Sequence, residues 1–330
     1  MKKSDYITIV NEEFKRKSER ALLECERRKS EIYAKIPKIK QINDDLSDNI
    51  HQFISSISSK QFNDAEFYQH KNHSLDLQQE RAELLHENGY PIDYLDRESV
   101  YECQKCKDEG FIGTQMCECY KKQFALSFLE QTHLGAIFKN QTFDNYKLSY
   151  FDKNAEDDNA SQYIKMKKIL DFCIKYSKDF SINSPNLLFK GNPGCGKTYL
   201  SSAIGYDLIN KGYMVIYTPV QQMIDEYEAE KFNKREADTS IYTDCDLLII
   251  DDLGTEFQTA LSENVLFNVI NSRVNEKKPM IISTNYTSEE MKGIYHDRLF
   301  SRLTYEFISF MFVDKDIRNE IKKRKAIKKD

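Results

Sequence analysis

The fold is decided by the stretch Asn186-Leu-Leu-Phe-Lys-Gly-Asn-Pro-Gly-Cys-Gly-Lys-Thr198, in which an apolar run leads into a loop of the form G-x-x-x-x-G-K-T. Its glycines let the backbone curl with its N–H groups turned inward, where a Cβ would collide with a bound phosphate. The apolar residues 187–189 predict a buried strand, and residues 199–209 have helical spacing. A strand, a glycine-rich loop and a helix in this order are the context that a phosphate-binding loop requires.

The loop predicts a nucleotide site with Mg²⁺. Lys197 is expected to reach the β- and γ-phosphates, and the Thr198 hydroxyl to ligate the metal. The N-terminus of the following helix adds a partial positive charge. The predicted nucleotide-binding residues are therefore those of the loop and the residue after it: Gly191, Asn192, Pro193, Gly194, Cys195, Gly196, Lys197, Thr198 and Tyr199.

A second apolar run, Leu247-Leu-Ile-Ile-Asp251-Asp252, ends in two carboxylates. The carboxyl end of a buried parallel strand opens at the mouth of the sheet, beside the phosphate-binding loop. Asp251 is therefore predicted to hold Mg²⁺ through water, and Asp252 to polarise the water that attacks the γ-phosphate.

Strands and helices alternate through the second half of the chain. The strand segments are continuous apolar runs, which is typical of strands buried on both faces. The predicted class is thus α/β, a parallel sheet covered by helices. Further strands are expected at 213–217, 246–252, 280–283 and 307–313. Helices are expected at 160–178, between the strand at 213–217 and residue 232, and at 261–275.

Composition narrows the functional classes. The chain has 330 residues and a net charge of −5, which argues against a protein that grips nucleic acid with its whole surface. No apolar run is long enough to span a membrane, and the start lacks the apolar core of a signal peptide, so a cytoplasmic protein is expected. In that compartment clustered cysteines indicate a metal site rather than disulfides.

Four of the cysteines are clustered. Cys103, Cys106, Cys117 and Cys119 are spaced as C-x2-C, ten residues, then C-x-C. Four thiolates close a tetrahedral site with no open position, so a structural Zn²⁺ is predicted. His86 and His133 are alternative ligands nearby in the sequence.

The first hundred residues predict a charged helical arm. Helices are expected at 6–34, after Pro37, and at 64–87, and no titratable cluster indicates a second active site. Two interpretations remain open: a hairpin that packs on itself, and a surface that receives a partner's helices. After the proline a narrow apolar seam is expected at Ile39, Leu46, Ile50, Phe53 and Ile57.

Taken together, the motifs resemble the bacterial DnaC/DnaI family of replicative helicase loaders. The resemblance rests on the loop, on LLIIDDLG, on Ser283-Thr-Asn285 and on Asp297-Arg298-Leu-Phe-Ser-Arg302; the cysteine knuckle resembles the DnaI-type branch. It covers about residues 101–318. It implies an AAA+ core without a large carboxy-terminal lid, and a protein that binds the hexameric helicase and helps to place it on single-stranded DNA.

The resemblance also implies roles for single residues. Asn285 matches the group that senses the γ-phosphate, and Arg302 matches an arginine finger that acts in a neighbouring subunit, which implies self-assembly. Arg318 matches a second sensor, or is one charge at the start of a basic tail. The tail's cluster at 322–329 is expected to lie along DNA phosphates or in solvent. Many AAA+ enzymes carry Glu where this chain has Asp252, so slow turnover is expected.

The expected domain division is a helical arm (1–100), a zinc knuckle with its helix (101–135), a linker (136–159) and the ATPase (160–330). Two other functions compete with a loader: a transposition helper ATPase of the IstB kind, which binds duplex DNA, and a nucleotide-gated adaptor with negligible hydrolysis. The knuckle and the long arm favour the loader.

Overall fold

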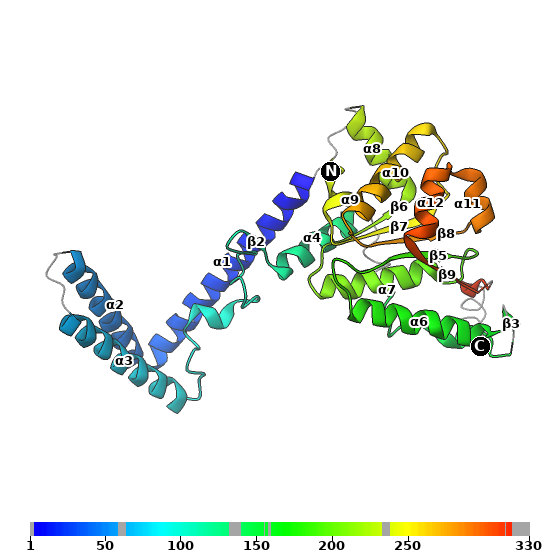
Figure 1. The fold of residues 1–330 in the computed structure, drawn as a ribbon. Coiled ribbons are helices and arrows are strands. Elements are labelled where there is room, and N and C mark those ends of the chain that lie inside the picture. Colours follow the sequence, from blue (N-terminus) through cyan, green and yellow to red (C-terminus); the bar gives the residue numbers. More distant parts are fainter. Residues whose placement is uncertain are drawn as a thin grey trace. The chain divides into compact units, whose positions relative to one another are not determined.

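The computed structural model describes residues 3–58, 64–131, 140–154, 156–157, 160–232, 238–313 and 315–318 (Figure 1). The chain forms two compact units. One contains Met1–Asn11 and Met116–Asp330 and is called the ATPase unit, after the activity that its phosphate-binding loop predicts. The other, the arm unit, contains Glu12–Gln115. Within the described residues, no helix combines the length and the apolar character that crossing a membrane requires.

A five-stranded sheet is the centre of the ATPase unit, and its strands are all parallel, in the order β6-β7-β8-β5-β9. Residues Leu247 to Ile250 of strand β7 are fully buried, because helices cover both faces of the sheet. The predicted parallel α/β fold is therefore confirmed. The strands are β5 (Asn186–Lys190), β6 (Val215–Pro219), β7 (Leu247–Leu253), β8 (Met280–Thr284) and β9 (Phe307–Met311).

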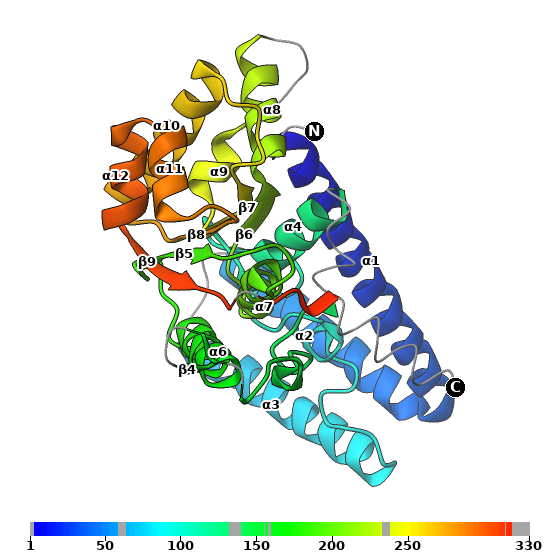
Figure 2. The same cartoon turned by 90° about the vertical axis from the view of Figure 1, so that its right-hand side faces the viewer.

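Helices lie on the two sides of this sheet (Figures 1 and 2). Alternate strand residues such as Leu187 and Phe189 pack in one cluster with α6 (Gln162–Lys178) and α7 (Lys197–Asn210). Above the other face lie α8 (Val220–Lys231), α10 (Ala260–Asn275) and α12 (Asp297–Tyr305). Short helices α9 (Ser240–Asp244) and α11 (Ser288–Ile294), which the sequence did not predict, complete this layer.

The residues before the sheet also pack into the ATPase unit. In α4 (Glu118–Gln131), Phe128 contacts Tyr6 from the first turns of α1 (Lys3–Lys35), with ring centroids 5.4 Å apart. Phe151, which follows η2 (Leu148–Tyr150), is 4% exposed within the main core. Phe151, with Phe143, Tyr146 and Leu148 packed against the same cluster, therefore ties this part of the expected linker to the core. A small antiparallel pair, β3 (Glu156–Asp157) and β4 (Ala160–Ser161), leads into α6.

The arm unit is built from helices. The rest of α1 is followed by α2 (Pro37–Ser58), α3 (Asp64–Glu87) and η1 (Arg97–Val100), and a two-stranded sheet joins β1 (Phe111–Ile112) to β2 (Gln115–Met116). Pro37 is the first residue of α2, where a helix needs no N–H donor. The small core contains Ile32, Ile39, Leu85 and Leu95.

One part of the predicted apolar seam is wrong. Ile50 and Ile57 on α2 are 53% and 49% exposed, whereas Asn49 is 6% exposed. The Asn49 amide donates to the His70 carbonyl (2.9 Å) and to the Ser74 hydroxyl (2.7 Å) of α3. Because these bonds replace those to water, a polar side chain takes the inward position that the spacing had assigned to Ile50.

Candidate nucleotide-binding site

An open cavity of about 540 Å³ lies at the carboxyl ends of β5 and β7. It brings together residues that are far apart in the sequence and that were predicted to share one site. Those that line it are Pro193, Gly194, Gly196, Lys197, Thr198, Tyr199, Asp251, Asp252, Asn285 and Arg318.

The loop between β5 and α7 curls as its sequence predicts, with Gly194 at φ +84° and Gly196 at φ +102°. A Cβ on Gly194 would lie 2.2 Å from the Asp316 carboxylate, and the Ile317 N–H donates to the Gly194 carbonyl over 3.0 Å. Residues 315–318 therefore cross the loop and bring Arg318 into the cavity. This crossing is a second reason for glycine at 194, one that the motif alone does not reveal.

Lys197 is held in position by the loop itself. Its ammonium donates to the carbonyls of Gly191 (2.6 Å) and Asn192 (3.0 Å), and to the side-chain oxygen of Asn285 (2.8 Å). The residue is 4% exposed. Gly191 and Asn192 thus act through their carbonyls on the lysine. Cys195 is fully buried, and burial raises the pKa of its thiol.

Asp251 is surrounded by hydroxyl donors. The Thr198 hydroxyl lies 3.1 Å from one carboxylate oxygen, and the hydroxyls of Tyr217 and Ser283 also donate to the carboxylate. Burial and the neighbouring Asp251 raise the pKa of Tyr217. A carboxylate and a threonine hydroxyl side by side are the hard oxygen ligands that Mg²⁺ prefers, so the donor set fits this metal.

Tyr217 and Ser283 were missed in the sequence. They lie on β6 and β8, the strands that flank β7. A feature of the sequence that could have identified them is a polar side chain near the carboxyl end of an otherwise apolar strand.

Asp252 follows Asp251 in an unusual backbone conformation, with φ +57°. Its N–H donates to the Ser283 hydroxyl over 2.9 Å. Burial and the adjacent Asp251 raise the pKa of its carboxyl group, and Lys197 and Arg318 act in the opposite direction. A left-handed conformation is costly for a non-glycine residue, and such strain is typical of functional sites.

Two further side chains enter the site from the segment that precedes the sheet. Gln141 lines the cavity, and the Tyr146 hydroxyl would lie 3.4 Å from a Cβ on Gly196. Gln141 Oε1 and the Tyr146 hydroxyl are buried, and in the described part of the chain neither has a hydrogen-bond partner. Nothing in the spacing of residues 136–159 had indicated this role.

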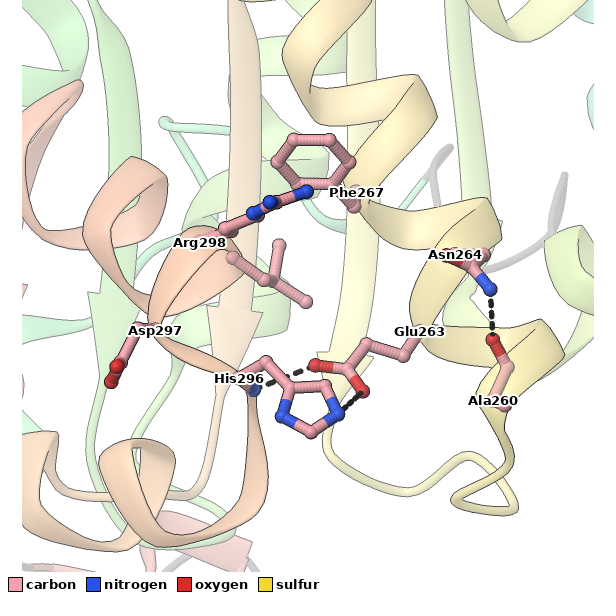
Figure 3. A pocket seen from close by; sticks show the side chains of 8 residues that line it. Ala260, Glu263, Asn264, Phe267, His296, Asp297 and Arg298 are labelled. Atoms are coloured by element: carbon pink, nitrogen blue, oxygen red, sulfur yellow. Dashed lines mark hydrogen bonds and ion pairs between the residues drawn. The ribbon is translucent and has the colours of Figure 1, made fainter.

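Of the predicted site residues outside the loop and the cysteine cluster, Arg302 does not line this cavity. It lies on α12, where its guanidinium pairs with Glu306 over 3.0 Å. Arg298, one turn earlier, lines a different cavity between α10 and α12 (Figure 3).

The cysteine cluster forms as predicted. The sulfur atoms of Cys103, Cys106, Cys117 and Cys119 all lie within 4.8 Å of one another. A tetrahedron with Zn–S bonds of about 2.3 Å separates its sulfurs by about 3.8 Å, so the group fits a zinc ion. His86 is not in this group. His133 and the basic tail at 322–329 lie outside the described residues.

Comparison with known proteins agrees with this geometry. Residues 143–306 match the family described as IstB-like ATP binding protein. The replicative helicase loader DnaC of Escherichia coli (strain K12) is 24% identical over 201 residues, which cover 60% of this chain and 77% of that protein. DnaC of Buchnera aphidicola subsp. Acyrthosiphon pisum (strain APS) is 24% identical over 194 residues, covering 55% and 74%.

Two solved structures are also similar. A crystal structure of the DnaC helicase loader has a TM-score of 0.44 and 19% identity, and covers 54% of this chain and 99% of that one. A crystal structure of DnaI has a TM-score of 0.41 and 19% identity, with coverage of 53% and 92%. In its sequence, the chain is similar to the replicative helicase loader DnaC and to the IstB-like ATP binding proteins.

Proposed function

We propose that this protein uses ATP to load a hexameric replicative helicase onto single-stranded DNA. The observation that carries the proposal is the cavity in which Lys197, Asp251, Asp252, Asn285 and Arg318 meet. Such a cavity suits a protein that binds ATP and hydrolyses it. The similarity to proteins named replicative helicase loaders supplies the partner and the DNA.

Within the cavity each side chain has a proposed task. Lys197 binds the β- and γ-phosphates, Thr198 and Asp251 hold Mg²⁺, and Asp252 orients the attacking water. Bound Mg²⁺ neutralises charge on the phosphate oxygens. The Asn285 amide, already hydrogen-bonded to Lys197, lies where it can contact the γ-phosphate. Arg318 is proposed to contact the nucleotide from the opposite wall.

Arg302 is proposed to act on a nucleotide held by a neighbouring subunit. Its position on α12, away from the cavity of its own chain, supports a role across an interface. An arginine finger is worth about 10³ to 10⁵ in rate in related enzymes. The isolated chain should therefore bind ATP yet hydrolyse it slowly.

The arm is proposed to contact the helicase, and the cysteine knuckle to hold one structural zinc ion next to it. On α2, Ile50, Ile54 and Ile57 form a stripe that is 53%, 54% and 49% exposed, so apolar surface remains available to a partner. Ile54→Lys should abolish co-elution of the full chain with the helicase on size exclusion. Leu23→Lys, at another exposed apolar position of the arm unit, serves as the control. Co-elution of the Ile54→Lys chain at the wild-type level would remove the arm from the interface.

The function is tested by steady-state turnover of the chain alone, with single-stranded DNA, and with DNA and helicase. Turnover should rise only in the assemblies. Arg302→Ala should bind ATP normally and lose this stimulation, and Lys197→Ala should lose binding. A mixture of the two variants should recover activity, since it rebuilds some complete interfaces. Stimulated turnover by Arg302→Ala alone would refute the finger.

The match to the IstB-like family keeps a transposition helper as the second candidate. That function predicts tight binding to duplex DNA and no complex with the helicase, which the same size-exclusion experiment detects. An adaptor without hydrolysis predicts that the assemblies leave turnover unchanged.

A further inference from the structure

We infer that Glu256 and Tyr295 form a buried link that positions the helix of Arg302 relative to Asp252 of the same chain. A chain would then present two parts of the machinery, its own catalytic carboxylate and the finger for its neighbour, in one fixed geometry. The inference rests on the proposed function, because it requires hydrolysis across a subunit interface.

The link starts in the turn that follows β7. The Asp252 carbonyl accepts hydrogen bonds from the Thr255 N–H (3.1 Å) and from the Thr255 hydroxyl (2.9 Å). Gly254 has φ +104°, and a Cβ there would lie 2.1 Å from the ring of Tyr286. The Tyr286 hydroxyl donates to the Gly254 carbonyl over 3.0 Å. The turn is thus tightly packed. A displacement of Glu256 at its end should therefore also displace Asp252 at its start.

Glu256 closes this turn with a buried carboxylate that is 4% exposed. One oxygen accepts from the Gly254 N–H (2.6 Å), and the other accepts from the Gln258 amide (2.7 Å) and from the Tyr295 hydroxyl (2.6 Å). These donors are all neutral. A charged acceptor makes strong hydrogen bonds and is costly to leave short of donors, so the carboxylate holds Tyr295 firmly.

Tyr295 connects the turn to the finger helix. It is 3% exposed and lies between α11 and His296, the N-cap residue of α12. Glu263 of α10 also contacts the start of α12. One of its carboxylate oxygens accepts from the His296 N–H over 2.6 Å, and the other lies 3.2 Å from the His296 ring (Figure 3).

Beyond these two anchors α12 has room beside it. An open cavity of about 450 Å³ lies between α10 and α12. Among the side chains that line it, Figure 3 shows Glu263 in contact with His296. Leu299 and Leu303 pack α12 inward, and Arg302 lies on the same helix. Because Tyr295 directly precedes the N-cap residue of α12, the hydrogen bond from its hydroxyl to Glu256 helps to fix where the helix of Arg302 begins.

The test is Tyr295→Phe, which keeps the ring and removes the hydroxyl. Tyr176→Phe is the matched control, because its hydroxyl donates to the Pro185 carbonyl over 3.0 Å at a similarly buried site away from α12. We expect nucleotide affinity of the isolated Tyr295→Phe chain to stay within about twofold of wild type. Turnover stimulated by assembly should fall about threefold to thirtyfold, the range of couplings carried by single positions. The Tyr176→Phe control should keep the wild-type nucleotide affinity and the wild-type stimulated turnover.

Mixed assemblies identify which part of the machinery is affected. If the finger is misplaced, Lys197→Ala chains, which supply an intact finger, should restore turnover by Tyr295→Phe chains, and Arg302→Ala chains should not. The opposite pattern would mean that Tyr295 serves its own catalytic turn, and would overturn the inference. So would an unchanged turnover of Tyr295→Phe. If instead wild-type chains show no stimulation, the proposed function fails as well, and the two failures are thereby distinguished.

Discussion

The two units of this chain bury their residues in different ways. In the ATPase unit the strands β5, β6, β7 and β8 are covered on both faces, and one core cluster joins them to α6 and α7. In the arm unit the fully packed cluster is small and lies where α1, α2 and α3 meet. Exposed charged residues along the arm's helices form ion pairs, such as Arg27 with Glu24. Such exposed pairs contribute little to stability.

This difference explains where prediction succeeded. A strand buried on both faces has no side that a polar residue can occupy freely, so its apolar run has one interpretation. A helix with a narrow seam has several faces that satisfy the same spacing, and a single asparagine with good partners decides between them. The arm should therefore depend on a few specific contacts, and the ATPase unit on its whole core.

The largest expected effect is on the cysteine knuckle. Elemental analysis should find one zinc per chain, and chelation or Cys103→Ser should unfold the segment, since structural zinc contributes about 10–16 kcal/mol of apparent binding free energy. ATP binding should persist, because none of the four cysteines lines the nucleotide cavity. Cys25→Ser, outside the cluster, should retain the metal. A chelated chain without metal that keeps the knuckle folded would contradict the zinc site.

Arg273 should be the most sensitive single position of the ATPase unit. It is 0% exposed, and its guanidinium donates to the carbonyls of Tyr242, Thr243, Cys245 and Pro279. Arg273→Leu should lower the free energy of unfolding of this unit by about 3–5 kcal/mol, because buried carbonyls lose their donors. Urea unfolding measures this. Exposed Arg298→Leu should change it by less than about 0.5 kcal/mol. Equal values for both variants would show that the buried cage is unimportant.

Substitutions of Asp252 and Asp251 should have different effects: one on the hydrolysis step and the other on nucleotide binding. Asp252→Asn should reduce stimulated turnover about 100-fold or more, the size typical of losing a general base, with nucleotide affinity unchanged. Asp251→Asn should instead weaken binding of the magnesium nucleotide, because it removes the metal's anchor. Single-turnover kinetics and nucleotide titration distinguish the two. Hydrolysis at the wild-type rate by Asp252→Asn would show that Asp252 does not orient the attacking water.

The smallest expected effect concerns the arm's seam. Asn49→Ala should destabilise the arm unit by about 1–2 kcal/mol, because it removes the hydrogen bonds to His70 and Ser74. Ile50→Ala should change stability by less than about 0.5 kcal/mol, since Ile50 is 53% exposed. Denaturant unfolding followed by helical circular dichroism measures both. If Ile50→Ala lowered the free energy of unfolding more than Asn49→Ala did, Ile50 would belong to the buried seam, as the sequence predicted.

The sequence by itself determined the phosphate-binding loop, the β7 carboxylates, the cysteine group and the parallel α/β fold. Glycine geometry and continuous apolar runs act locally, so the residues that carry them are neighbours in the chain. The order of the strands, by contrast, places Tyr217 and Ser283 on either side of Asp251.

The tertiary structure decided which further groups, outside the motifs, take part in a site or in the core. It brings Gln141 and Arg318 to one cavity, buries Arg273 among backbone carbonyls, and joins Glu256 to Tyr295. None of these pairs follows a spacing rule. Each depends on how helices pack across a sheet, where a polar group is retained because another element, far along the chain, supplies its hydrogen-bond partner.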